Sequence, residues 1–357
     1  MSDAAKLTRW AHSFLIAAGF VVVVAGMKAG QALIAPMLLA VFLAIICSPP
    51  LFWLQQKRVP SGLAVVLVIA GFVGIWLVLG YVAGSSLLTM RENLPEYQRN
   101  LRGHLEGFLK WLNDRGIDTP DDLLSQHLKP EAIIDATKTV LGQLTSLLAS
   151  AALILLTAVF ILLEASSLSA KMRAIAKDPT ASVARFHEIT KNVRHYVALK
   201  TLISLVTGVA ITIALTIIGV DFPVLWGLFA FLFNFIPNIG SFIAAIPAVM
   251  LALVQLGPKQ AFTTGVAYVV VNVVIGNVIE PKVMGKGLGL SPLVVFVSLV
   301  FWGWVLGPVG MLLSVMLTMI MKIVLDSNED TRWIAVLLGT EDSAKVVLAE
   351  RESDERA

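Results

Sequence analysis

The sequence predicts an all-α integral membrane protein with about eight transmembrane helices or hairpins, an inverted repeat in its C-terminal half and a small helical extramembrane domain. Three observations support this fold class. Of the 357 residues, 57% are hydrophobic and only 14% are charged, whereas soluble domains average about 25% charged residues. Long charge-free runs recur along the chain, and most basic residues flank alternate ends of those runs. The lipid bilayer is therefore the first expected partner.

Six apolar runs have the length of a single transmembrane span. They cover residues 11–27, 30–47, 61–83, 141–163, 201–219 and 260–279. Lys6 and Arg9 precede the first run, as in a signal peptide, but the run is long and a second follows within a few residues. We therefore expect the first run to stay attached as a transmembrane helix.

Two further runs, residues 222–258 and 287–321, are too long for one span. The first has 37 residues without a charge and the second has 35. A straight helix of 37 residues would measure about 55 Å, whereas the hydrocarbon core of a bilayer is about 30 Å thick. Two full spans would need about 40 residues. Each run is therefore predicted to form a hairpin of two short helices, and length alone leaves open whether its tip crosses the membrane.

The basic residues predict cytoplasmic N- and C-termini, because short cytoplasmic loops carry an excess of Lys and Arg. With both hairpins returning to their starting side, only Lys28 and Lys259 lie in short outside connections. Fourteen others flank cytoplasmic ends: Lys6, Arg9, Lys57, Arg58, seven between Lys171 and Lys200, Lys282, Lys286 and Lys322. If the first hairpin were a single span, Lys282 and Lys286 would lie outside, so the distribution of basic residues favours a hairpin.

This topology divides the chain into six parts. Residues 1–86 are the N-terminal transmembrane helices, 87–140 an extracytoplasmic helical domain broken at Gly116 and Pro120, and 141–163 a transmembrane helix. Residues 164–200 form a cytoplasmic amphipathic segment, 201–325 two helix-plus-hairpin units, and 326–357 a cytoplasmic acidic tail. The amphipathic segment suits a helix on the membrane surface or one packed on other helices.

The two helix-plus-hairpin units form a weak internal repeat. The hairpins turn at "PNIG" (237–240) and "GPVG" (307–310), and Gly240 and Gly310 are 70 positions apart. An odd number of spans separates them, so the units have inverted topology. Inverted repeats with interrupted helices are typical of secondary transporters, whose site lies where the broken helices meet. The alternative is that these residues only set tight turns between packed helices.

On the transporter hypothesis, residues 201–325 are the transport core, and the two tips approach each other near mid-membrane. Its substrate-binding candidates are turn residues and intramembrane amides: Asn234, Pro237, Asn238, Gly240, Asn272, Asn277, Gly307, Pro308 and Gly310. Uncharged donors and acceptors suit a small polar solute that is neutral or weakly charged. Glu280, at a cytoplasmic helix end, either pairs with a nearby lysine or binds a coupling proton or cation.

The single span of each unit carries residues at intervals of four, which keeps them on one helix face. One set is Lys200, Ser204, Gly208, Thr212 and Thr216, and the other is Tyr268, Asn272, Gly276 and Glu280. Small residues on such a face usually indicate close helix packing. The amides are harder to explain by packing, because an amide facing lipid would lack partners.

The stretches "FIPNIGSFIAAIP" (235–247) and "NVIEPKVMGKGLGLSPLVVFVSLVFWGWVLGPVGMLLSV" (277–315) resemble the autoinducer-2 exporter family of bacterial inner-membrane permeases. The resemblance covers nearly the whole chain. It implies a permease of about eight helices that exports a small solute, with autoinducer-2 as the candidate, and a homo-oligomer for which a pentamer is one option. A sodium(lithium)/proton antiporter is the alternative within the family, which implies Na⁺ or H⁺ coupling.

Other classes of protein fit the sequence less well. A zinc protease would need a second histidine where Lys191 follows His187 and Glu188. We predict no catalytic residue, cofactor or metal site, and the net charge of +3 gives no reason to expect a nucleic-acid partner. A membrane scaffold or regulatory protein that binds a partner through residues 87–140 is a second rival, although inverted hairpins would be superfluous for that role. A channel is the third rival, and the sequence does not separate a channel from a carrier.

Overall fold

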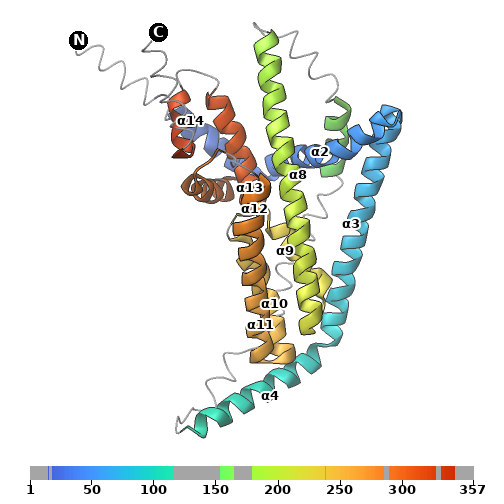
Figure 1. The fold of residues 1–357 in the computed structure, drawn as a ribbon, viewed down its shortest axis with the longest axis vertical. Helices are drawn as coiled ribbons and strands as arrows, with labels where there is room; N and C mark the ends of the chain where they lie inside the picture. Colours follow the sequence, from blue (N-terminus) through green and yellow to red (C-terminus); the bar gives the residue numbers. More distant parts are fainter. Residues whose placement is uncertain are drawn as a thin grey trace, which may run out of the picture. The chain divides into compact units, whose positions relative to one another are not determined.

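The computed structural model describes residues 15, 18–115, 153–164, 179–237, 239–284, 289–326 and 331–341, which are helical apart from short connections and contain no strand (Figure 1). Five helices are long and apolar enough to cross a membrane: Gln31–Gln56, Ser61–Glu92, Thr190–Ile218, Pro258–Val283 and Pro292–Asp326. Four shorter apolar helices are Ala18–Ala29, Leu153–Glu164, Pro223–Phe233 and Gly240–Leu256. The protein is thus an all-α membrane protein, as predicted. The expected total of about eight spans or hairpins stays a prediction.

The chain forms two compact units. Unit 1 consists of Met1–Ile45, Leu153–Val193 and Gly289–Ala357, and unit 2 of Ile46–Ala152 and Arg194–Leu288. Each predicted hairpin belongs to one unit. The first hairpin lies in unit 2 and the second in unit 1.

Unit 2 is built from helices on both sides of the first hairpin. They are α3 (Ser61–Glu92), α4 (Leu94–Asn113), the end of α8 (Pro179–Ile218), α9 (Pro223–Phe233), α10 (Gly240–Leu256), α11 (Pro258–Asn272), the π-helix η1 (Val273–Ile279) and α12 (Glu280–Met284). α3 continues six residues past the expected domain boundary at 86. α8 runs unbroken through Lys200, where the amphipathic segment was expected to end. The predicted breaks at Gly116 and Pro120 lie outside the described residues.

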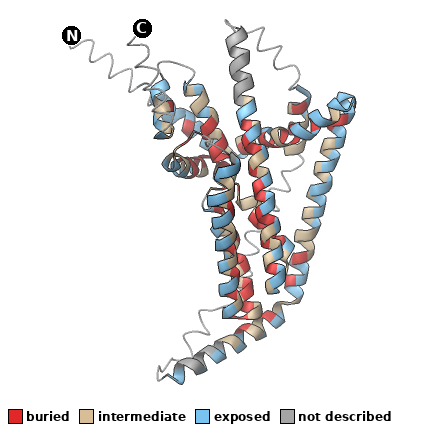
Figure 2. Ribbon diagram, in the orientation of Figure 1, coloured by how far each residue is buried: buried red, intermediate tan, exposed pale blue. Residues whose placement is uncertain are grey.

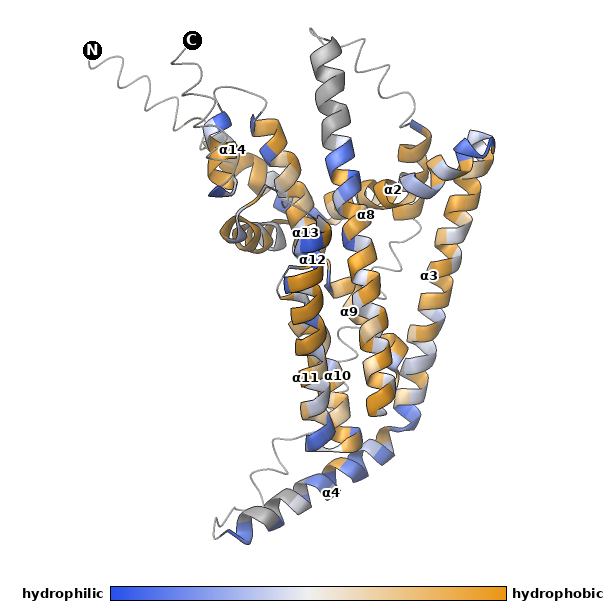
Figure 3. Ribbon diagram, viewed as in Figure 1, coloured by the Kyte–Doolittle hydropathy of each residue, from blue (hydrophilic) through white to orange (hydrophobic). Residues whose placement is uncertain are grey.

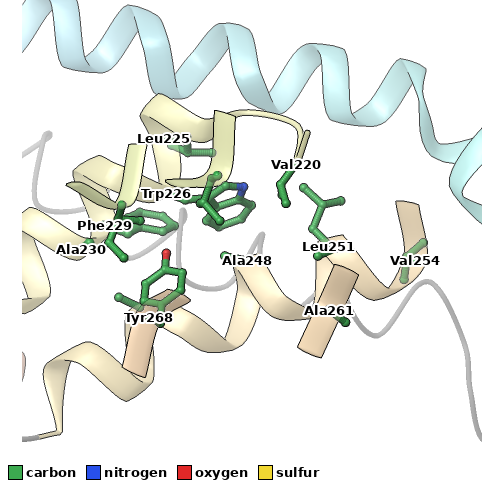
Figure 4. Close-up of a cluster of buried hydrophobic side chains, with 14 of the residues drawn as sticks. Val220, Leu225, Trp226, Phe229, Ala230, Ala248, Leu251, Val254, Ala261 and Tyr268 are labelled. Atoms are coloured by element: carbon green, nitrogen blue, oxygen red, sulfur yellow. The ribbon is translucent and has the colours of Figure 1, made fainter. Parts of the chain in front are cut away.

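Residues 222–258 fold back on themselves as α9 and α10, which confirms the first predicted hairpin. Its open end is held by Gln255, whose Oε1 accepts the backbone N–H of Asp221 at 2.9 Å and whose Nε2 donates to the carbonyl of Gly219 at 3.2 Å. Between the helices lies a cluster of buried side chains, with Trp226 and Phe229 from α9 against Ala248 from α10 and Tyr268 from α11 (Figure 4).

Residues 289–321 of the second predicted run also fold back on themselves, within α13 (Pro292–Asp326) of unit 1. The helix is interrupted at Gly307, whose φ of 66° and ψ of −150° are accessible to glycine and strained for other residues. Trp302 Nε1 donates to Thr318 Oγ1 at 3.0 Å. Sixteen residues of straight helix would separate this pair by about 24 Å. Lys322 Nζ donates to the carbonyl of Gly289, so the two ends of the run lie together.

The two hairpin tips share a close backbone approach. A Cβ at Gly240 would lie 1.8 Å from the carbonyl oxygen of Phe233, and a Cβ at Gly310 would lie 1.9 Å from that of Trp302. Only glycine fits at either position. The two tips are therefore alike in this one feature of backbone geometry.

Unit 1 packs the second hairpin against the N-terminal helices. Val24 and Trp302 share a buried cluster with Val305 and Leu306, and Ile34 from the start of α2 (Gln31–Gln56) packs on it. The short helix α14 (Arg332–Leu338) follows, and its Leu338 carbonyl accepts the backbone N–H of Ser291 at 3.2 Å.

The surface of the helices is largely apolar, as lipid contact requires. Tyr81 on α3, Ile217 on α8 and Phe262 on α11 are each at least 76% exposed. Much of α3 is exposed in Figure 2, whereas buried residues gather along α8 to α11. α4 differs from its neighbours, because hydrophilic and hydrophobic residues alternate along it (Figure 3).

Candidate functional site

One face of α8 carries a series of polar and small residues that meet the rest of unit 2. Tyr196, Lys200, Ser204 and Gly208 follow one another at intervals of four, and all four are buried. Lys200 is 5% exposed and Ser204 is fully buried. Because a buried lysine requires a partner, this face of α8 is a candidate functional site.

The partner of Lys200 is Glu280. Lys200 Nζ donates to Glu280 Oε1 at 2.7 Å, with the lysine side chain 6% exposed and the glutamate side chain 24% exposed. Glu280 opens α12 directly after the π-helix η1, and π-helical turns are frequent at functional sites. Of the two interpretations of Glu280, pairing with a lysine is thus observed, and the ion pair is sheltered rather than solvent-exposed.

The tip of the first hairpin reaches the same face of α8 one turn away. Asn234, which follows the last residue of α9, donates through Nδ2 to Ser204 Oγ at 3.0 Å. Lys200 and Ser204 are four residues apart, or about 6 Å along the helix axis. An amide–hydroxyl pair and an ion pair therefore lie on adjacent turns of α8.

Further along α8, the packing interpretation is confirmed. Gly208 crosses Gly227 of α9 so closely that a Cβ at Gly227 would lie 2.6 Å from the carbonyl oxygen of Gly208 and 1.9 Å from Thr212 Oγ1. Thr212 Oγ1 donates to the carbonyl of Gly208 at 2.9 Å. The face of α8 thus changes from polar pairing at Lys200 and Ser204 to close helix contact at Gly208 and Thr212.

The other predicted site residues of unit 2 are placed differently. Asn272 Nδ2 donates to the carbonyl of Tyr268 in its own helix at 2.8 Å. Asn277 lies exposed on η1, and its side chain has no hydrogen bond among the described residues. Pro237 is half-buried at the tip and Gly240 is buried behind it, while Asn238 lies outside the described residues.

Gly307, Pro308 and Gly310 belong to unit 1, where Gly310 is buried and Pro308 is exposed. The predicted approach of this tip to the tip of the first hairpin stays a prediction.

Lys200 and Ser204 are the site residues that sequence reasoning did not assign. Their signal was present, because both stand in the four-residue series on the span before the first hairpin. Small residues in that series suggested packing alone, and nothing in the sequence showed that Glu280 and Asn234 would reach two adjacent positions of it.

The opposite end of the first hairpin is closed by α4. Tyr97 Oη donates to Asp221 Oδ2 at 2.6 Å, and Asn100 Nδ2 donates to the carbonyl of Gln255 at 3.3 Å. One turn further along α4, His104 lies against Gly257, which joins α10 to α11. Burial, reinforced by the bond to Asp221, raises the pKa of the Tyr97 phenol. This end of unit 2 is therefore fastened by a second polar network.

Within the described ranges, no three His, Cys, Asp or Glu side chains gather as a metal site would require. The charged pair Lys200–Glu280 and the uncharged pair Asn234–Ser204 are instead the groups that could recognise a cation and a polar solute.

Three features of this structure are typical of a multi-pass membrane transporter. Its helices expose apolar side chains, its two hairpins turn at proline–glycine sequences, and its ion pair is sheltered from solvent. The comparisons with known proteins identify the family. The AI-2E family transporter profile matches residues 16–329. The chain belongs to this family and is a transporter of the bacterial inner membrane.

Curated relatives match over nearly their whole length. The AI-2 transport protein TqsA of Escherichia coli K12 is 40% identical over 318 residues, which cover 89% of this chain and 92% of that protein. The putative transport protein YhhT of the same strain is 36% identical and covers 92% of this chain and 94% of its own. A putative transport protein of Haemophilus influenzae is 37% identical, with coverage of 92% and 96%.

Proposed function

We propose that the protein is an ion-coupled secondary transporter that exports a small, polar, uncharged solute. The observation that carries this proposal is the placement of the Asn234–Ser204 and Lys200–Glu280 pairs on adjacent turns of α8. An amide and a hydroxyl can donate to and accept from a neutral solute. The neighbouring carboxylate can exchange one cation for another, so solute binding and ion binding would influence each other.

Autoinducer-2 is the solute to test first, because the relative with 40% identity is named as its transport protein. The proposed site includes the predicted residues Pro237, Asn238 and Gly240, which follow Asn234 closely in the sequence. Asn272 and Asn277 lie on the helix that leads to Glu280. We propose that this surface, together with Gly307, Pro308 and Gly310 of the second hairpin, forms the solute pathway.

Glu280 is the proposed ion-coupling residue. Lys200 then acts as an internal cation that a proton or Na⁺ must replace at the carboxylate. Competition of this kind links ion occupancy to the position of α12 relative to α8, because the bond of 2.7 Å breaks when the carboxylate is protonated or binds another cation.

A sodium(lithium)/proton antiporter is the second candidate function, and the same ion pair favours it. In that case the Asn234–Ser204 hydrogen bond would only stabilise the fold, and the protein would transport only the cations that exchange at Glu280. The two candidates differ in whether a solute moves with the ion.

The two hairpin units are proposed to be inverted repeats with cytoplasmic N- and C-termini. The similar approach of Gly240 and Gly310 to a preceding carbonyl supports a common origin for the two tips. A homo-oligomer, with a pentamer as one option, is proposed from the family resemblance and can be tested by native mass spectrometry in mild detergent and lipid nanodiscs.

Flux measurements in proteoliposomes test the proposed function. Purified protein is reconstituted, and movement of synthetic autoinducer-2, Na⁺, Li⁺ and H⁺ is followed with and without imposed gradients of Na⁺ and H⁺. An ion-coupled exporter moves autoinducer-2 faster when a gradient is imposed. Movement of cations alone would instead establish the antiporter, and movement of neither would refute both functions.

A further inference from the structure

Two hydroxyl groups on one face of α11 are buried without a hydrogen-bond partner among the described residues. They are Thr264 Oγ1 and Tyr268 Oη. Thr264 is fully buried and Tyr268 is 2% exposed. The two residues stand four positions apart, so their side chains leave α11 on the same side, one turn from each other.

Tyr268 projects into the core of the first hairpin. Its ring packs with Trp226 and Phe229 of α9 and Ala248 of α10, and its hydroxyl points toward Phe229 and Trp226 in Figure 4. The indole N–H of Trp226 already donates to the carbonyl of Asp221 at 2.9 Å. Among the residues that the structure describes, the phenol therefore lies against apolar groups and meets no hydrogen-bond donor or acceptor.

This placement is unfavourable for stability. A buried hydroxyl without a partner lowers the folding equilibrium by roughly tenfold or more. Phe at position 268 and Val at position 264 would fill similar volumes without that penalty. Buried polar groups without partners call for an explanation such as a functional role.

Both residues stand on the helix face that leads to the ion pair. Tyr268 is followed one turn later by Asn272, whose amide bonds the Tyr268 carbonyl, and two turns after Asn272 comes Glu280. The Tyr268 hydroxyl thus extends the polar side of α11 and η1 into the hairpin core, and Thr264 stands one turn farther from Glu280.

We propose that Thr264 and Tyr268 form a solute-binding site that is closed in this structure and opens when the first hairpin separates from α11. This inference rests on the proposed transport function and adds specificity-determining residues to it. Each hydroxyl can donate one hydrogen bond and accept others. Trp226 and Phe229 supply apolar surface beside Tyr268. The matching ligand is a small neutral molecule with hydroxyl or carbonyl groups on a compact carbon skeleton.

The variants Tyr268→Phe and Thr264→Val test the site, because they remove the hydroxyls and keep the shape. For a solute site, each variant unfolds at an unchanged or higher temperature, while the half-saturation concentration for autoinducer-2 in proteoliposomes rises about two- to tenfold. If the two hydroxyls have only a structural role, for example in binding a buried water, the variants would change the unfolding temperature and leave the half-saturation concentration for autoinducer-2 unchanged. That result would overturn the proposal.

Two matched controls accompany these variants. Thr263→Val removes a hydroxyl from the exposed neighbour, which bonds the carbonyl of Lys259, and Tyr81→Phe removes an exposed phenol from α3. Both should leave half-saturation unchanged. Asn234→Ala is measured in parallel. If it weakens transport while Tyr268→Phe and Thr264→Val do not, the further site is refuted and the proposed transport function stands.

Accessibility gives a readout that needs no solute. After Cys47→Ser, the variant Thr264→Cys is treated with a small membrane-permeant methanethiosulfonate reagent, with Leu215→Cys on α8 as the buried control. Opening of the hairpin predicts labelling of position 264 and none of position 215. Equal absence of labelling at both positions would refute the opening of the site.

Discussion

Lys200 and Glu280 are 80 residues apart in the sequence, and their side chains meet at 2.7 Å. The pair joins α8, which precedes the first hairpin, to α12, which follows the π-helix. Asn234 contacts Ser204 one turn away on the same face of α8. The tip of the first hairpin and the proposed coupling residue therefore act on neighbouring positions of a single helix.

The first prediction concerns the amide–hydroxyl pair. Asn234→Ala and Ser204→Ala should each lower autoinducer-2 flux in proteoliposomes by about two- to tenfold, because each removes a hydrogen-bonding group worth about 0.5–1.5 kcal/mol. Because the two groups contact each other, the double variant should lose less than the product of the single losses. Independent, multiplicative losses would show that the two residues do not act together.

The second prediction concerns the crossing of α8 and α9. Gly227→Ala should destabilise the protein by about 1–3 kcal/mol, because the added Cβ would lie 2.6 Å from the Gly208 carbonyl oxygen. Gly276→Ala is the matched control, since no atom outside its own helix turn lies within 4 Å of its Cβ position. Denaturant unfolding in detergent provides the measurement, and equal stability of the two variants would contradict the close crossing.

The third prediction is topological. After Cys47→Ser, the variants Ser291→Cys and Lys322→Cys should be labelled from the same, cytoplasmic face by an impermeant maleimide. The reason is that Lys322 bonds the Gly289 carbonyl, which places both ends of the second hairpin together. Labelling from opposite faces would contradict the hairpin, and labelling of both from the outside would reverse the proposed orientation.

The fourth prediction concerns the fastening of α4. Burial and the bond to Asp221 raise the pKa of Tyr97 above its ordinary value of about 10. The unfolded chain releases the Tyr97 proton at a lower pH than the folded chain. The contribution of Tyr97 to the free energy of unfolding is therefore present below about pH 10 and is lost as the pH rises further. Tyr97→Phe should lower the unfolding temperature at pH 7 and reduce its fall above pH 10. Tyr81→Phe is the control, and parallel pH curves for wild type and Tyr97→Phe would contradict this role.

The sequence was sufficient to predict the two hairpins, because charge-free runs of 37 and 35 residues exceed one span and carry proline–glycine turns near their centres. It was also sufficient to mark Glu280, since a carboxylate beside an apolar helix needs a partner. It did not identify that partner as Lys200, because contacts over 80 residues depend on how helices pack. Nor did it show that Asn272 would bond its own helix, that α8 would pass unbroken through Lys200, or that α11 would continue as a π-helix.

The sequence could not predict either that the hydroxyls of Thr264 and Tyr268 would be buried without a hydrogen-bond partner among the described residues. Tyr268 was visible as a member of a four-residue series, but its burial against Trp226 and Phe229 follows from the hairpin core. Thr264 gave no separate signal. A threonine on an apolar helix commonly bonds the carbonyl four residues earlier, as Thr212 and Thr216 do, and only the structure shows that Thr264 does not.

Coupling through the ion pair is tested most directly by removing both of its charges. Glu280→Gln alone leaves Lys200 buried without a partner, which costs roughly 3–5 kcal/mol, whereas replacing both members of a buried pair is often neutral. The double variant Lys200→Met/Glu280→Gln should therefore fold and assemble like the wild type. In proteoliposomes, it should move autoinducer-2 down its gradient at a rate that imposed Na⁺ or H⁺ gradients do not change. Stimulation of the double variant by either gradient to the wild-type extent would contradict coupling at Glu280.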